Sequence, residues 1–231
     1  MWCIPPGQNG QFVARMEQVL DVYARPDDKR RPVVCMDEQP VQLTSETRTP
    51  IPVKPGCKAK SDYEYTREGT CVVWMFVEPL GGWRMVPVTS RRTAVDWAHR
   101  MKELVDHPRY ADAEKITVVL DNLNTHDLGS LYEAFPPEEA KRIADKLELV
   151  FTPKHGSWLN IAECELSVLT RQSMSDRLES ESKVQSRATP WAEERNKAQT
   201  GVDWQFTTAK ARTKLKRLYP KMRPDGPLGS V

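Results

Sequence analysis

Three carboxylates, far apart in the sequence, stand where ordered segments end or begin. Asp37 closes the apolar run RPVVCM, Asp121 closes the run KITVVL, and Glu163 lies early in a helical pattern. Carboxylate oxygens are the ligands that Mg²⁺ prefers, and such sites leave positions open for phosphate. Two such ions can hold the attacking and leaving oxygens of a phosphoryl transfer. We therefore expect the three carboxylates to converge into a pocket for divalent metal.

Each carboxylate also has a purely structural interpretation. An Asp at the end of a strand often forms a turn, because its side chain can bond the backbone that follows. The pattern Asn160-x-x-Glu163 resembles a capping box, in which Glu163 would reach back to the first turn of a helix. Periodicity does not choose between Glu163 and Glu165, since each lies between apolar residues. These alternatives stay open at the level of sequence.

The spacing of apolar residues predicts alternating strands and helices that would position the carboxylates. The expected elements are a helix at 11–25, a strand at 31–36, a loop at 44–62 with a marginal strand at 51–53, a hairpin of strands at 70–79 and 83–90, a helix at 93–107, a strand at 115–121, a helix at 129–147 interrupted at Pro136-Pro137, a strand at 148–153 and a helix at 159–177. An antiparallel three-stranded meander followed by helix-linked parallel strands makes a mixed α/β sheet. If the first and fourth strands pair at its centre, Asp37 and Asp121 become neighbours.

Charge is concentrated near the end of the chain. Residues 207–223 carry seven cations and no acid, although the net charge of the whole sequence is only +2. We expect a basic helix at 207–219 to bind DNA phosphates, and a disordered tail at 221–231. Residues 178–203 are expected to form a surface helix or a linker. The candidate DNA-binding residues are Lys210, Arg212, Lys214, Lys216 and Arg217.

Other classes of protein are disfavoured by the composition. No apolar run approaches the ~20 residues of a membrane span, and the first residues do not have the pattern of a secretory signal. The five cysteines are scattered and the four histidines lack zinc spacing, so reduced thiols in a cytoplasmic compartment are expected.

The motifs resemble those of DDE transposases, specifically bacterial insertion-sequence enzymes related to the mariner superfamily. The resemblance covers about residues 10–220 and rests on DE at 37–38, LDNLNTH at 120–126 and the Pro-x-His…Trp-Leu-Asn-x-x-Glu run at 153–163. It implies an RNase H-like fold of a mixed sheet flanked by helices. It also implies two Mg²⁺ or Mn²⁺ ions held by Asp37, Asp121 and Glu163, hydrolytic nicking at transposon ends, strand transfer by the freed 3′-OH, and a homodimer on DNA.

Four further residues lie within these motifs. His126 and His155 could order a scissile phosphate or water, or could equally satisfy a turn. Asn122 and Asn160 are candidates for orienting the carboxylates. Glu38 is expected to face away from Asp37 and to have a structural role, because side chains alternate along a strand.

Two departures from the family pattern matter. Asp121 and Glu163 lie 42 positions apart, and only 36 residues precede Asp37, whereas the family places helix-turn-helix domains there. We therefore expect a catalytic half, whether a truncated copy, a separate reading frame that works with a helix-turn-helix polypeptide, or a degenerate remnant. The expected divisions are an N-terminal helix and linker at 1–30, a catalytic domain at 31–177 and a basic helical extension at 178–231. The alternative function is a non-catalytic remnant or subunit that binds DNA or other transposase chains.

Overall fold

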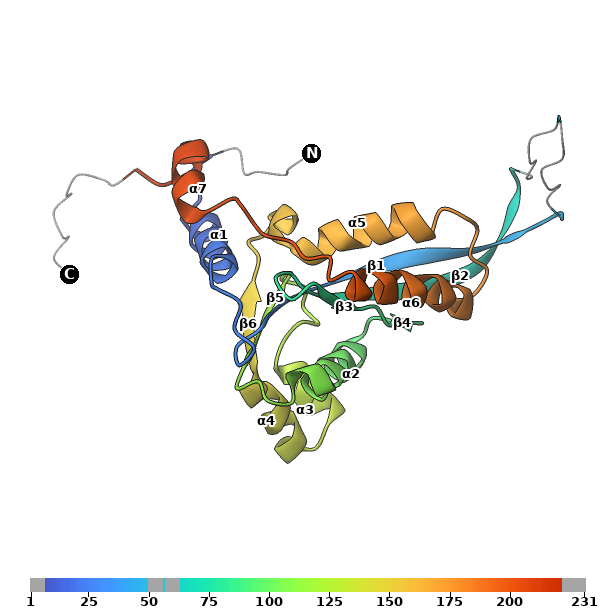
Figure 1. The fold of residues 1–231 in the computed structure, drawn as a ribbon, viewed down its shortest axis with the longest axis horizontal. Coiled ribbons are helices and arrows are strands. Elements are labelled where there is room, and N and C mark those ends of the chain that lie inside the picture. Colours follow the sequence, from blue (N-terminus) through green and yellow to red (C-terminus); the bar gives the residue numbers. More distant parts are fainter. Residues whose placement is uncertain (1–6, 50–55, 57–62, 222–231) are drawn as a thin grey trace, which may run out of the picture.

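A mixed sheet forms the centre of the molecule, with helices on both faces (Figure 1). The computed structural model describes residues 7–49, Gly56 and residues 63–221. In this part of the chain the strands lie in the order β3-β2-β1-β5-β6, with β4 also paired to β2. The marginal strand expected at 51–53 and most of the expected tail lie outside the described residues. No helix in the described part is long and apolar enough to cross a membrane.

The expected meander and parallel strands are confirmed. β1 (Val33–Glu46) pairs antiparallel with β2 (Tyr65–Glu78), which pairs with the short β3 (Trp83–Met85) and β4 (Val88–Thr89). On its other side β1 runs parallel to β5 (Ile116–Leu120), which runs parallel to β6 (Leu147–Phe151). β1 and β5 are therefore neighbours, as the proximity of Asp37 and Asp121 requires.

The first strand is longer than its apolar run predicts, and Asp37 lies inside it rather than at its end. β5 pairs with β1 only from Val33 to Cys35, whereas pairing with β2 continues to Glu46. The second half of β1 is thus open toward β5, where Pro40 is tolerated because no ladder bond is needed on that side. Asp37 lies just beyond the end of the parallel pairing with β5, which stops at Cys35, so it remains beside the end of β5.

The helices divide into two layers around two apolar clusters. α1 (Gly10–Tyr23), α5 (Ile161–Ser173), α6 (Glu181–Lys197) and α7 (Thr208–Lys214) pack with Cys35 and Val119 on one face. α2 (Ala94–Val105), α3 (Gly129–Ala134) and α4 (Pro137–Lys146) cover the other. Short 3₁₀ turns occupy Pro108–Tyr110, Ser157–Leu159 and Lys216–Leu218. The break expected at Pro136-Pro137 separates α3 from α4.

α6 is a core helix on one side, which the polar composition of residues 178–203 concealed. Its buried residues are Val184, Ala188, Trp191 and Ala192, and these share one helical face. Two arginines and one carboxylate hold it in place. Glu165 of α5 lies 3.0 Å from Arg84 Nε and 2.8 Å from Arg195 Nη2, and both guanidinium groups lie over the ring of Trp191. This cluster joins β3, α5 and α6.

The Arg84 side chain is fully buried and that of Glu165 is 5% exposed, so removal of the carboxylate leaves an uncompensated buried charge. We expect Glu165→Ala to lower the free energy of unfolding by about 3–5 kcal/mol in urea titrations. Glu194→Ala, at an exposed position of α6, should change it by less than about 0.5 kcal/mol. Equal effects of the two variants would contradict the structural role of the cluster.

Candidate active site

The three carboxylates line one pocket, formed by β1, the residue after β5, the 3₁₀ turn that contains Ser157, and one face of α5. Asp37 comes from within β1, Asp121 directly follows β5, and Glu163 lies on the first turn of α5. The complete lining is Asp37, Glu38, Gln39, Asp121, Ser157, Glu163, Leu166, Ser167, Thr170 and Arg171. Residues separated by more than a hundred positions in the chain thus share one site.

The amide of Asn160 places α5 against β1. It is fully buried, donates from Nδ2 to the Met36 carbonyl oxygen at 2.8 Å, and accepts at Oδ1 from the Ala162 N–H at 3.1 Å. One side chain therefore binds the residue before Asp37 and caps the helix that carries Glu163. The Asn160 backbone N–H donates to Ser157 at 2.7 Å instead of to Glu163. Among the described residues the reciprocal half of the capping box is absent.

The ambiguity between Glu163 and Glu165 is resolved by burial. Glu165 points into the cluster with Arg84 and Arg195 on the far side of the helix. Glu163 is exposed and lines the pocket. The two residues are 200° apart around an α-helix, so one helix serves core and pocket at the same time.

Asp37 is the carboxylate of the site whose pKa is raised by its surroundings. Burial, and then the nearby charges of Glu38, Asp121 and Glu163, raise its pKa from 3.8 to about 7. Its Oδ1 accepts the Glu38 backbone N–H at 2.8 Å, and no bond to its Oδ2 is found in the described part of the chain. Like charges held close together favour binding of a positive ion.

Asp121 is paired with a histidine. The His126 side chain is fully buried, with Nδ1 2.7 Å from Asp121 Oδ1 and Nε2 3.3 Å from Glu38 Oε2. Burial opposes the charged imidazole, but the two carboxylates outweigh it and raise the pKa of His126 to about 9. Burial likewise opposes ionisation of Asp121, but the hydrogen bond and charge of His126 lower its pKa overall. At neutral pH the imidazolium can donate from Nδ1 to Asp121, and its Nε2 lies within ion-pair distance of Glu38.

The other motif residues differ in position. His155 is exposed, has a left-handed backbone (φ 64°) and lies in the turn in which the Gly156 N–H donates to Pro153 at 2.8 Å. This position favours the turn interpretation of His155. Asn122 is exposed, and neither residue lines the pocket. Of the four candidates, Asn160 contacts β1 and the first turn of α5, and His126 contacts Asp121.

Sequence reasoning missed several lining residues. Leu166, Ser167, Thr170 and Arg171 follow Glu163 at positions three, four, seven and eight, which form one helical face. Extending that face from Glu163 would have revealed Arg171, the cationic residue of this lining. Gln39 lies two residues after Asp37 and therefore on the same face of β1, but the apolar run predicts a strand that ends before it.

The donors suit a hard divalent cation in their chemistry. Each aspartate has Oδ1 engaged within the protein, and no bond to its Oδ2 is found among the described residues. No group of three His, Cys, Asp or Glu side chains in the described part stands close enough to hold an ion as oriented here. Binding would thus require the carboxylates of Asp37 and Glu163, which no ion pair holds in the described part of the chain, to move toward Asp121.

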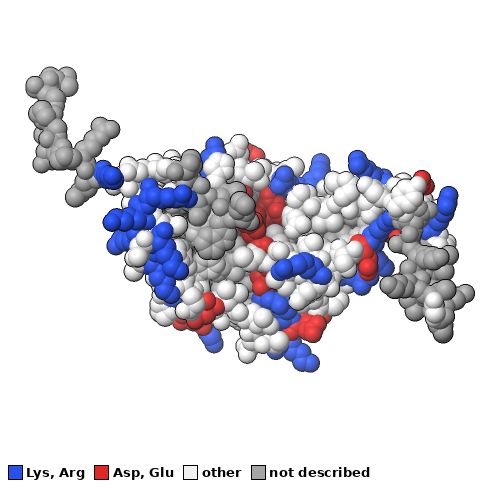
Figure 2. All heavy atoms as spheres, turned by 90° about the horizontal axis from the view of Figure 1, so that it is seen from above, with Lys and Arg blue, Asp and Glu red and all other residues white. Residues whose placement is uncertain are grey.

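The basic segment forms two short helical pieces instead of one helix at 207–219. α7 ends at Lys214, and a 3₁₀ turn follows that buries Leu218, with Leu215 buried three residues before it. Spacing by three suits a 3₁₀ turn, which accounts for the early end of the α-helix. Lysine and arginine side chains gather over α7 at one end of the molecule, and acidic side chains form a separate band nearer its middle (Figure 2).

Arg212 binds within the protein. Its Nε and Nη2 lie 2.8 and 2.9 Å from the two carboxylate oxygens of Glu17 on α1, and the Tyr219 hydroxyl donates to the same carboxylate at 2.8 Å. Lys210 donates to the Gln205 carbonyl at 2.6 Å. In the described part of the chain no ion pair engages three exposed cations: Lys214, Lys216 and Arg217. Arg212 therefore anchors α7, and these three form the open cationic surface.

Comparison with known proteins agrees with the motifs. A family model described as DDE superfamily endonuclease matches residues 32–185, more than half of the chain. No curated protein matches the chain.

Solved structures of Mos1 complexes share the fold at low identity. The Mos1 mariner paired end complex with Mn has a TM-score of 0.55 and 16% identity, over 85% of this chain and 60% of that one. The Mos1 strand transfer complex has a TM-score of 0.54 and 14% identity, over 82% of this chain and 56% of that one. The Mos1 paired end complex with Mg has a TM-score of 0.53 and 13% identity, over 94% of this chain and 66% of that one. The chain thus has the RNase H-like fold that the motifs predict, and spans 56–66% of these relatives' length.

The raised pKa of Asp37 predicts a pH-dependent cost to stability. A carboxyl group that titrates at about 7 when folded and near 3.8 when unfolded stabilises the fold fully below pH ~4, and this stability is lost as pH rises from ~4 to ~7. Without metal, Asp37→Asn should therefore raise the thermal midpoint at pH 8, with a smaller gain at pH 5. Asp127→Asn, at an exposed turn, should show no such trend. A larger gain at pH 5 would contradict the assignment.

Proposed function

This chain belongs to the DDE superfamily endonucleases, and on that premise we propose that it is the catalytic domain of an insertion-sequence transposase. The reaction proposed is metal-dependent cleavage of DNA at the transposon ends, followed by strand transfer to a target. The observation that carries the proposal is the convergence of Asp37, Asp121 and Glu163 on one pocket from three separate elements. The same convergence favours an enzyme over a non-catalytic subunit.

We propose that Asp37, Asp121 and Glu163 hold two Mg²⁺ or Mn²⁺ ions. Bound divalent cations supply charge stabilisation to the phosphoryl transfer and activate the attacking oxygen. The chain's own contribution is to present the uncommitted Oδ2 atoms of the two aspartates while Oδ1 of each is held. Arg171, across the pocket on α5, is placed to attract a DNA phosphate by charge.

We propose that DNA also contacts the open cationic surface of Lys214, Lys216 and Arg217. Arg212, Tyr219 and Glu17 fix the segment on α1, so these cations are presented on a preformed support. Phosphate contacts of this kind position DNA without reading its sequence. Arg212, a candidate from the sequence, is assigned to this support, and Lys210 contributes at its edge.

The partners proposed are DNA, as transposon end and target, and a second copy of the chain in the active complex. A helix-turn-helix polypeptide would supply recognition of the end sequence. The described cysteines Cys35, Cys71 and Cys164 are free thiols, which supports a reducing, cytoplasmic setting.

Asp121→Asn should abolish Mg²⁺-dependent nicking of supercoiled plasmid DNA. The amide keeps the shape of the side chain but removes the charge that would hold a cation. The matched control is Asp127→Asn in the same loop, where the side chain bonds the Gly129 N–H outside the pocket. It should nick at the wild-type rate. Cleavage that persists in chelator, or full activity of Asp121→Asn, would exclude the mechanism.

The cationic surface predicts a salt dependence of DNA binding. Each phosphate contact changes log K against log[salt] by about −0.9. Replacing Lys214, Lys216 and Arg217 together by Ala should flatten this slope by up to about 3 units for all DNA sequences alike. Arg212→Gln should leave the slope nearly unchanged, because Glu17 already neutralises that charge. An unaltered slope in the triple variant would return this segment to ordinary solvated surface.

A further inference from the structure

We propose that Glu38 is a positioning residue, which acts through His126 to fix the orientation of the Asp121 carboxylate. The inference rests on the proposed function, since it concerns the same pocket. Asp37 and Glu38 are adjacent, and their side chains leave β1 on opposite sides of the strand. Both residues line the pocket, but the Glu38 carboxylate lies on the other side of the strand from that of Asp37 and reaches Asp121 by way of His126.

The first step in the path is the buried carboxylate of Glu38. Its side chain is 2% exposed, with Oε2 3.3 Å from His126 Nε2 and Oε1 3.3 Å from Arg92 Nη1. Arg92 lies just before α2, whose first turn is fixed by the capping box of Thr93 and Asp96. A buried carboxylate with a cation on each oxygen is held in one rotamer.

The second step is the imidazole of His126. The ring is fully buried and stacks on Trp97, with centroids 5.9 Å apart and planes at 29°. This stacking limits tilt of the ring, and the two carboxylates determine its rotation about χ2. Without Glu38, the buried Nε2 would lose its ion pair, and it makes no hydrogen bond within the described residues. The cost of an unpaired buried donor would then favour reorientation of the ring.

The last step is Asp121 itself. Its Oδ1 lies 2.7 Å from His126 Nδ1 and accepts the Leu123 N–H at 3.3 Å. With Oδ1 held, the other oxygen can be directed toward the pocket. If the ring turned, Asp121 would lose its stronger anchor, and its carboxylate would rotate freely where a cation needs a fixed oxygen. Partners of this kind, beyond the direct ligands, govern metal affinity.

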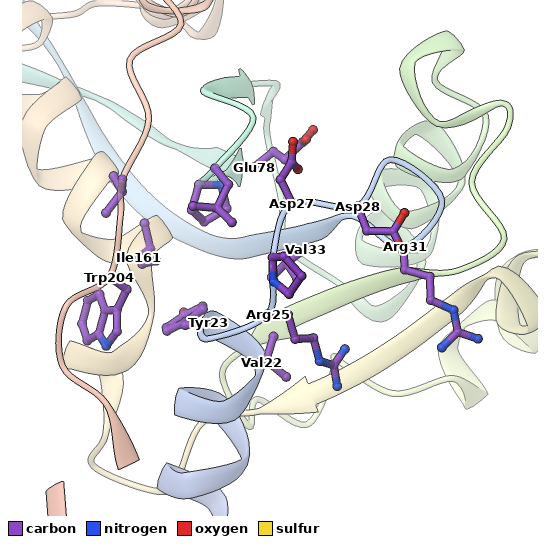
Figure 3. Close-up of a pocket in the computed structure, with 14 residues that line it drawn as sticks. Val22, Tyr23, Arg25, Asp27, Asp28, Arg31, Val33, Glu78, Ile161 and Trp204 are labelled. Atoms are coloured by element: carbon purple, nitrogen blue, oxygen red, sulfur yellow. The ribbon is translucent and has the colours of Figure 1, made fainter. Parts of the chain in front are cut away.

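The chain provides a close control in Glu78 of β2. Glu78 is also a buried carboxylate that binds one arginine and one ring residue, with Arg109 Nε at 2.6 Å and the Tyr110 hydroxyl at 2.9 Å. It lies beside a different pocket, near Val33 at the start of β1 (Figure 3). Loss of its charge should disturb packing to a similar degree without reaching Asp121.

The experiment measures Mn²⁺ affinity of the full chain by electron paramagnetic resonance of free Mn²⁺, well below the unfolding temperature of each variant. Glu38→Gln should weaken binding by about tenfold or more, and His126→Gln by a similar factor. Because the two residues act in series, the double variant should bind no more weakly than the weaker single variant. Glu78→Gln should change affinity by less than about twofold.

The outcomes separate this inference from the proposed function. Equal losses in Glu38→Gln and Glu78→Gln, additive losses in the double variant, or unchanged affinity in Glu38→Gln would each overturn the positioning role while leaving the metal site intact. A wild-type chain that binds no Mn²⁺ would overturn the metal site and the positioning role together. The positioning role is supported if Mn²⁺ binding weakens in Glu38→Gln but not in Glu78→Gln, and if the losses in the double variant are not additive.

Discussion

The start of α5 and the first half of β1 are joined through one buried side chain, the amide of Asn160. Its two hydrogen bonds, to Met36 and Ala162, fix the distance between the strand that carries Asp37 and the helix that carries Glu163. A buried amide with unsatisfied groups is costly, so the arrangement tolerates little sliding of the helix along the sheet. The geometry of the pocket depends on this constraint more than on any contact between the carboxylates themselves.

The carboxylates repel one another, and the surrounding protein offsets only part of that repulsion. Asp121 is stabilised by His126, whereas Asp37 remains close to other acids with a pKa near 7. The proposed cation site would exchange folding stability for affinity toward a cation, a common feature of functional sites. The side chains of Glu38 and His126 are buried beside the sheet, where His126 stacks on Trp97 of α2.

The sequence by itself determined the main elements and the candidate acids. Period-two and period-3.6 patterns are local, so the parallel strands, α2 and the break before α4 could be predicted from spacing alone. The position of Asp37, Asp121 and Glu163 within three motifs indicates the chemistry from the sequence alone. The mixed sheet order followed as well, because short connections leave few ways to assemble a meander with two crossover strands.

Tertiary structure alone decided which side chains serve the site and which serve the core. β1 extends past Asp37 because β2 supplies partners that the polar residues of β1 do not reveal. Glu163 and Glu165 have similar local patterns, and only the buried arginines separate them. Glu38 contacts His126, which lies 88 positions away in the sequence. Arg212 holds α7 on α1 through Glu17, which lies 195 positions away. Sequence periodicity fixes the face of an element, but burial and charge pairing arise from non-local packing, so only the folded chain assigns these roles.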